Sequence, residues 1–140
     1  MRINGRKMFI LLLFFALFML GGRFHDIGLS GGFDYVPSPQ LVRPTSDEVD
    51  MTGQTEFEFK WLREIGRYHG KEYYDFRLYK GYPMLESTLM FKRALPVSAS
   101  SVKVDAKMFE EGQVYTWSLR HVCGATKSDR SHVSFKVVKK

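Results

Sequence analysis

Two histidines and the chain's single cysteine have side chains that bind soft metal ions. His121 and Cys123 lie two positions apart, and His132 follows after a polar loop. Imidazole and thiolate groups suit zinc or copper. A structural zinc site, however, normally shows four closely patterned ligands, and a further histidine, His69, is distant in the sequence. We therefore expect Cys123 to be a small buried hydrophobe, and we expect no metal or other cofactor.

Catalytic signatures are weak in this sequence. Glu110 and Glu111 are adjacent, so on a turn their carboxylates point apart and cannot flank a scissile bond. No serine lies in a glycine-lined nucleophile elbow, and no phosphate-binding glycine loop or helical metalloprotease motif is present. Cys123 lacks the helix terminus or basic neighbours that lower the pKa of a thiol. We expect that the protein is not an enzyme and has no catalytic residues.

A group of tyrosines offers binding chemistry instead. Tyr73 and Tyr79 fall on the outward phase of an alternating segment, where a soluble face is normally polar. Exposed tyrosines stack on sugars or anchor protein partners, and a nearby arginine could favour an acidic ligand. The predicted ligand or partner surface consists of Tyr68, Tyr73, Tyr79, Tyr82 and Arg77. The alternative is that another strand or residues 23–38 cover the tyrosines, and that the basic residues form a solvated face.

The elements that position these side chains are predicted to be β-strands. Short segments alternate between apolar and polar residues, which is the period of a half-buried strand. Seven strands are expected, at residues 39–44, 57–61, 74–79, 89–92, 102–104, 115–119 and 133–137. Residues 45–53 and 124–131 are polar and are predicted to be a turn and a loop. Many short strands without a helical period indicate an all-β sandwich or small barrel.

The sixth segment is expected to be the central strand. Tyr115, Trp117 and Leu119 should face the core, whereas Thr116 and Ser118 occupy the polar, outward phase. Such large apolar side chains each stabilise the fold by roughly 1.5–3 kcal/mol when they are buried. A domain of this size can therefore form a core without disulfides, which a single cysteine could not supply.

The N-terminus is predicted to be a targeting segment. Arg2, Arg6 and Lys7 precede thirteen consecutive apolar residues at 8–20, a length that fits a signal-peptide core and falls short of the ~20 residues that span a bilayer. No small-x-small cleavage site follows, so cleavage and retention as an anchor both stay open. We expect a signal peptide or N-terminal membrane anchor at 1–22, a flexible spacer at 23–38 and one domain at 39–140.

The length and charge agree with one exported domain. A chain of 140 residues is one domain's worth of material. The net charge is +6, but 18 basic and 15 acidic residues remain from residue 23 onward. That balance is typical of a solvated surface, and we expect no nucleic-acid partner. Export would place the domain in the periplasm, at the cell surface or in the medium.

Four local features of residues 39–140 together resemble a known family. Prolines flank Leu41 in an opening strand, Trp61 closes the second strand, and residues 74–78 form the third. The fourth feature is Phe109-x-x-Gly112-x-x-Tyr115. This order is similar to that of a fibronectin type III domain, in which the corresponding tyrosine bonds back to the backbone of its turn.

The resemblance implies a seven-stranded, immunoglobulin-like sandwich preceded by an N-terminal hydrophobic helix. It implies structural roles for four residues: Trp61 in the core, Gly112 in the turn, Tyr115 locking that turn and Trp117 between the sheets. Phe109 and Trp117 depart from the family's usual leucine and valine, and its Arg-Gly-Asp tripeptide is absent.

The expected function is that of a non-catalytic exported cell-envelope protein, acting in protein–protein interaction or structural assembly. The alternative is a carbohydrate-binding module that uses exposed tyrosines. The partner would be an envelope protein or a glycan, with membrane contact through residues 8–20 if these are not cleaved.

Overall fold

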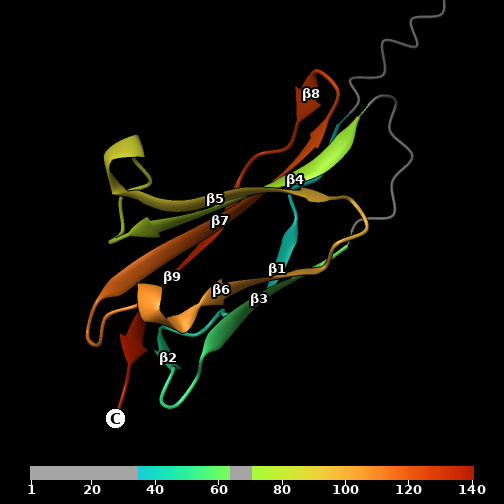
Figure 1. Cartoon of the computed structure of the whole chain (residues 1–140). Helices are drawn as coiled ribbons and strands as arrows, with labels where there is room; N and C mark the ends of the chain where they lie inside the picture. The colour runs from blue at the N-terminus through green and yellow to red at the C-terminus, as the bar shows by residue number, and fades with distance from the viewer. Residues whose placement is uncertain (1–34, 64–70) are drawn as a thin grey trace, which may run out of the picture. The chain divides into compact units, whose positions relative to one another are not determined.

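Alternating apolar side chains build two β-sheets in the part of the chain that the computed structural model describes, residues 35–63 and 71–140. Figure 1 shows these sheets as two layers. The smaller sheet has the order β1-β3-β6 and contains β1 (Gln40–Arg43), β3 (Glu56–Leu62) and β6 (Ser101–Asp105). Both pairings in it are antiparallel. The described residues are thus all-β apart from two short 3-10 helices, η1 (Glu86–Thr88) and η2 (Ala106–Met108).

The larger sheet has six strands in the order β2-β9-β7-β4-β5, with β8 paired to β7. Its strands are β2 (Glu48–Asp50), β4 (Glu72–Lys80), β5 (Leu89–Pro96), β7 (Val114–Cys123), β8 (Thr126–Lys127) and β9 (Ser131–Val138). Only β2 and β9 are parallel among these described pairs. As predicted, the segment at 115–119 is a central strand, since β7 lies between β4 and β9.

The predicted count of seven strands is wrong for the described residues, which contain nine. The additional strands are β2 and β8, in segments predicted to be a turn and a loop. Each has only two or three residues, which are too few to show alternation. Each is defined by its pairing with a long strand, β2 with β9 and β8 with β7. Val49 of β2 is buried beside β9, where it pairs with Val137.

The core lies between the inner faces of the two sheets and is rich in aromatic rings. Phe59 of the small sheet has its ring centroid 5.2 Å from those of Phe76 and Trp117 in the large sheet. Trp61 packs edge-on against Tyr74 at 5.6 Å. Edge-to-face and offset pairs at these distances stabilise a core beyond the area that they bury. The predicted structural residues Trp61, Tyr115 and Trp117 are all buried.

Strand β7 is buried on both faces, which corrects the expectation that its polar residues face water. Thr116 and Ser118 have no exposed surface. The Thr116 hydroxyl donates to the Gly81 carbonyl at 2.7 Å, and Ser118 Oγ accepts a hydrogen bond from Arg130 at 3.3 Å. Small hydroxyl side chains with such partners can be buried because their hydrogen bonds are satisfied.

The turn before β7 has the predicted geometry. Gly112 has a φ of +74°, a conformation that glycine adopts without steric cost. The Tyr115 hydroxyl accepts a hydrogen bond from the backbone N–H of Glu110 at 2.7 Å. The tyrosine therefore bonds back to the backbone of its turn, and whether this bond stabilises the turn stays a prediction.

The predicted targeting segment at 8–20 and most of the predicted spacer at 23–38 lie outside the described residues. Within residues 35–63 and 71–140, no helix is both long and apolar enough to cross a membrane. Val36 is 4% exposed, so the packed region already includes this residue, three positions before the predicted start of the domain.

Candidate functional site

The predicted tyrosine surface is not one continuous set of exposed rings. Tyr82 is 70% exposed, Tyr73 is half-buried, and Tyr68 lies outside the described residues. Tyr79 is only 3% exposed, so the expectation that its ring faces solvent is wrong. It follows a register shift between β4 and β5. Whether Tyr73 and Tyr82 bind a ligand stays a prediction.

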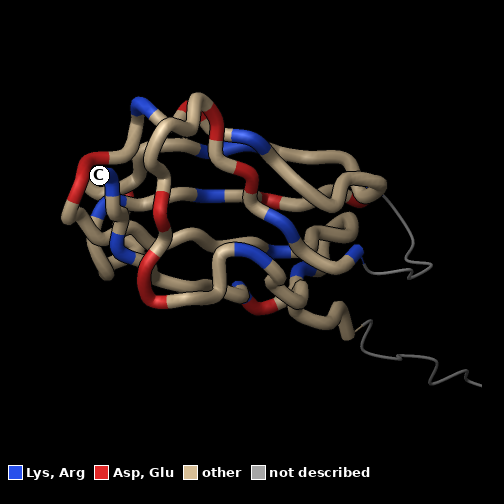
Figure 2. Tube along the Cα trace, turned by 90° about the horizontal axis from the view of Figure 1, so that it is seen from below, with Lys and Arg blue, Asp and Glu red and all other residues tan. Residues whose placement is uncertain are grey.

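Arg77 is held by acidic neighbours. Its guanidinium contacts the Asp75 carboxylate at 3.2 Å and the Glu86 carboxylate at 3.3 Å. A shallow depression over β4 and β5 contains Arg77 and Asp75 together with Lys71, Glu72 and Lys92. Figure 2 shows basic and acidic residues interspersed along the described chain. The depression therefore carries both positive and negative side chains, and its charge does not identify it as a binding site.

A loop between β4 and η1 concentrates exposed apolar side chains. We call residues 81–85 the tip loop. Six large hydrophobic residues of the described chain are strongly exposed, and three of these lie in the tip loop: Tyr82 at 70%, Met84 at 37% and Leu85 at 57%. Contiguous exposed apolar groups are typical of interaction sites.

The tip loop is fixed at both ends by hydrogen bonds. At its start, the Gly81 N–H donates to the Val114 carbonyl at 2.8 Å, and the Thr116 hydroxyl donates to the Gly81 carbonyl. At its end, the Thr88 hydroxyl donates to the Pro83 carbonyl at 2.7 Å and accepts from the Leu85 N–H at 3.2 Å. These hydrogen bonds therefore order the backbone of the tip loop.

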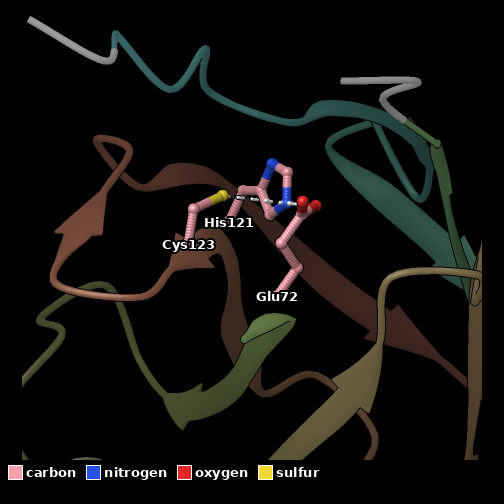
Figure 3. A group of neighbouring side chains, drawn as sticks. All are labelled: Glu72, His121 and Cys123. Atoms are coloured by element: carbon pink, nitrogen blue, oxygen red, sulfur yellow. Dashed lines mark hydrogen bonds and ion pairs between the residues drawn. The ribbon is translucent and has the colours of Figure 1, made fainter. Parts of the chain in front are cut away.

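A second site brings together a carboxylate, an imidazole and a thiol. Glu72 begins β4, whereas His121 and Cys123 are at the end of β7, and the two strands pair Glu72 directly with Cys123. The imidazole Nε2 is 3.3 Å from Cys123 Sγ and 3.3 Å from Glu72 Oε2 (Figure 3). His121 is fully buried, Cys123 is 4% exposed, and the Glu72 side chain is 15% exposed.

The structure separates the residues that the sequence pattern had grouped. His121 and Cys123 share one face of β7, as their spacing predicted. His132 is exposed on β9, where it pairs with Ser118, and it does not belong to this cluster. His69 lies outside the described residues. Glu72 was missed, although it shares the inward period-two phase of Tyr74 and would have been found by extending the third strand by one step.

The cluster is not arranged for nucleophilic catalysis. In a triad, the nucleophile and the orienting acid contact opposite nitrogens of the imidazole, whereas here the thiol and the carboxylate both face Nε2. Burial, with a smaller effect of the Glu72 charge, raises the pKa of the Cys123 thiol to about 11. A thiol with that pKa is protonated at neutral pH and is a poor nucleophile.

Comparison with known proteins assigns the chain to no family, so its description depends on its all-β, two-sheet fold and on these two sites. No protein-family model matches the chain, and no curated protein is significantly similar to it in sequence.

Proposed function

We propose that this chain is a non-catalytic, exported cell-envelope protein whose β-sandwich binds a protein partner through its tip loop. The observation that carries this proposal is the exposure of Tyr82, Met84 and Leu85 on a loop that backbone and hydroxyl hydrogen bonds already order. Tyrosine is enriched at binding hot spots. A preordered loop also loses less conformational entropy on binding than a flexible one.

The fold supports assignment to a fibronectin type III-like sandwich. The three-stranded sheet faces a sheet in which β9, β7, β4 and β5 are neighbours. Two largely antiparallel layers of this kind, with a tyrosine bonded to the turn before its strand, are compatible with immunoglobulin-like domains. Such folds host many functions, so the proposed role depends on the tip loop.

The carbohydrate-binding alternative has less support. A sugar module needs several exposed rings on one face, since each sugar stacks on an aromatic surface. Of the described tyrosines in the predicted surface, Tyr79 is buried and Tyr73 is half-buried, which leaves Tyr82 as the strongly exposed ring. A single exposed ring beside Met84 and Leu85 fits an apolar protein contact better than a sugar platform.

Export is proposed from the sequence of residues 1–22. Basic residues before an apolar run are typical of a signal that stays with its positive end in the cytoplasm. Fractionation of cells that express the full chain and a chain lacking residues 1–22 tests this. Only the full chain should leave the cytoplasm, and equal distribution of the two chains would contradict export. N-terminal sequencing of the exported product distinguishes a cleaved signal from a retained anchor.

Partner binding is tested by quantitative capture from solubilised envelopes. The wild-type chain is compared with Tyr82→Ser/Leu85→Ser, which removes apolar surface from the tip loop. The matched control is Val42→Ser/Leu62→Ser, which removes exposed apolar surface from the small sheet. We expect a specific partner to be retained by the wild type and the control and lost with the tip-loop variant. Equal retention by all three proteins would place binding elsewhere.

A further inference from the structure

We propose that Glu72, His121 and Cys123 form a zinc site with an open fourth position at one end of the β4–β7 pair. Their ligand atoms all lie within 4.8 Å of one another. The three residues come from strand positions separated by about fifty residues of sequence, and the pairing of β4 with β7 brings them to one place. Figure 3 shows the imidazole lying between the thiol and the carboxylate.

The distances around Nε2 match those of a tetrahedral zinc centre. With Zn–N, Zn–O and Zn–S bonds of about 2.0–2.3 Å, tetrahedral angles place nitrogen about 3.3 Å from oxygen and about 3.6 Å from sulfur. In the structure, His121 Nε2 is 3.3 Å from Glu72 Oε2 and 3.3 Å from Cys123 Sγ. At Nε2 only a small movement of the thiol away from the ring is required, and the thiol and the carboxylate, whose ligand atoms lie within 4.8 Å of each other, need to approach each other.

The shared nitrogen is compatible with a metal ion at its lone pair. One imidazole nitrogen either carries a single proton or offers a single lone pair. A protonated Nε2 donates to the Glu72 carboxylate and has in Cys123 Sγ only a weak second acceptor. A deprotonated Nε2 suits the thiol but puts a lone pair against the carboxylate oxygen. A dication placed among the three atoms satisfies all of them, because each then donates electrons to the same centre.

The backbone around the cluster is firmly held. The backbone N–H of His121 donates to Ser128 Oγ at 3.0 Å, and the Ser128 N–H returns a hydrogen bond to the His121 carbonyl at 2.9 Å. The Gly124 N–H donates to the Lys71 carbonyl at 2.9 Å, which ties the end of β7 to the start of β4. Ligands on rigid strands bind metals more precisely than ligands on loops.

The donor set selects the metal. One nitrogen, one sulfur and one oxygen donor suit zinc, which accepts all three types. Calcium and magnesium require oxygen ligands and are disfavoured by a thiolate and an imidazole. Three protein ligands leave the fourth zinc position for water or another exchangeable ligand.

Cobalt substitution tests the site in the full chain, kept in mild detergent and reduced after chelator treatment. Co²⁺ bound to a thiolate in a tetrahedral site gives a sulfur-to-metal charge-transfer band and intense visible bands. We expect both bands to appear at one equivalent of Co²⁺ and to vanish when Zn²⁺ is added. Absence of the charge-transfer band from the wild-type protein would overturn the proposal, and this result does not depend on any variant.

Substitutions then assign the ligands by zinc titration against a competing chelator. Cys123→Ser and His121→Ala should each lower zinc affinity by at least about tenfold. Loss of a residue that only hydrogen-bonds to a metal ligand already costs about that much, and these two residues are the proposed ligands themselves. Glu72→Gln keeps the side-chain size and should weaken binding while retaining the charge-transfer band. The matched control His132→Ala should bind zinc like the wild type. Unchanged affinity in Cys123→Ser would refute the site.

Thermal unfolding separates metal loss from misfolding. Zinc should raise the unfolding temperature of the wild type and of His132→Ala, because a ligand that binds only the folded state stabilises it. Magnesium should not. In chelator, Cys123→Ser and Glu72→Gln should still unfold cooperatively. Zinc should leave the unfolding temperature of Cys123→Ser almost unchanged and should raise that of Glu72→Gln less than that of the wild type. An equal zinc-induced shift in all four proteins would contradict the assigned ligands.

Discussion

The indole N–H of Trp117 donates a buried hydrogen bond to the carbonyl oxygen of Pro44 at 3.1 Å. Trp117 belongs to β7 of the large sheet, and Pro44 follows β1 of the small sheet. This buried bond therefore joins the two layers. Because the Trp117 side chain is fully buried, we assign it to stability and not to binding.

Trp117→Phe should destabilise the protein by roughly 2–4 kcal/mol, because it creates a cavity and leaves the Pro44 carbonyl without its donor. Trp61→Phe is the matched control: Trp61 is equally buried, but its indole N–H has no hydrogen-bond partner among the described residues. Its cost should be roughly 1–2 kcal/mol, from the lost volume alone. Urea unfolding measures both, and equal costs would show that the Pro44 bond contributes nothing.

Tyr115→Phe should lower the free energy of unfolding by about 0.5–1.5 kcal/mol, because the Glu110 N–H loses its acceptor. Tyr82→Phe removes a hydroxyl from a ring that is 70% exposed and should change stability by less than about 0.5 kcal/mol. Chemical denaturation of the two variants provides the comparison. An unchanged midpoint for Tyr115→Phe would argue against a stabilising lock on the turn.

Asp75 binds two guanidinium groups, those of Arg77 and Arg130, and its side chain is 13% exposed. Asp75→Ala should cost roughly 2–4 kcal/mol, because it removes the carboxylate that two partly buried positive charges share. Glu86 also contacts Arg77, but its side chain is 79% exposed. Glu86→Ala should therefore cost less than about 1 kcal/mol. Comparable losses for the two variants in urea unfolding would contradict this ranking.

Thr88→Val should loosen the tip loop without unfolding the domain. The variant keeps the side-chain shape but removes the hydroxyl that accepts from the Leu85 N–H and donates to the Pro83 carbonyl. Hydrogen exchange at the Leu85 amide should accelerate by roughly tenfold, since its protection depends on that acceptor. Thr126→Val, at an exposed position in β8, should leave this rate unchanged. If Leu85 exchanges equally fast in both variants, the hydroxyl does not order the loop.

The long strands could be predicted because apolar and polar side chains alternate in them over many residues. In β7 the buried residues Tyr115, Trp117 and Leu119 recur at every second position, and no other regular element explains that pattern. The strand β2 has only one buried residue, Val49, and its partner β9 lies more than eighty residues later in the chain. A three-residue pattern carries no period, so this strand depends on tertiary pairing.

The Glu72–His121–Cys123 cluster and the tyrosine surface could be predicted from the sequence only in part. The shared face of His121 and Cys123 follows from their spacing, but the third member, Glu72, depends on the register of β4 against β7. Tyr79 was expected to be exposed because period two places it on the outer face. Tyr79 is buried and lies at the register shift between β4 and β5, which alternation within one strand does not encode.

Photocrosslinking from the tip loop tests the central claim most directly. A photoreactive phenylalanine analogue is placed at Tyr82 in one protein and at Val42 in another. Both positions are exposed, but Tyr82 lies in the tip loop and Val42 lies in β1 of the small sheet. In intact cells, we predict one specific adduct from position 82 and none from position 42. Excess wild-type chain should suppress that adduct in solubilised envelopes, whereas Tyr82→Ser/Leu85→Ser should not. No adduct from position 82, or identical adducts from both positions, would contradict binding through the tip loop.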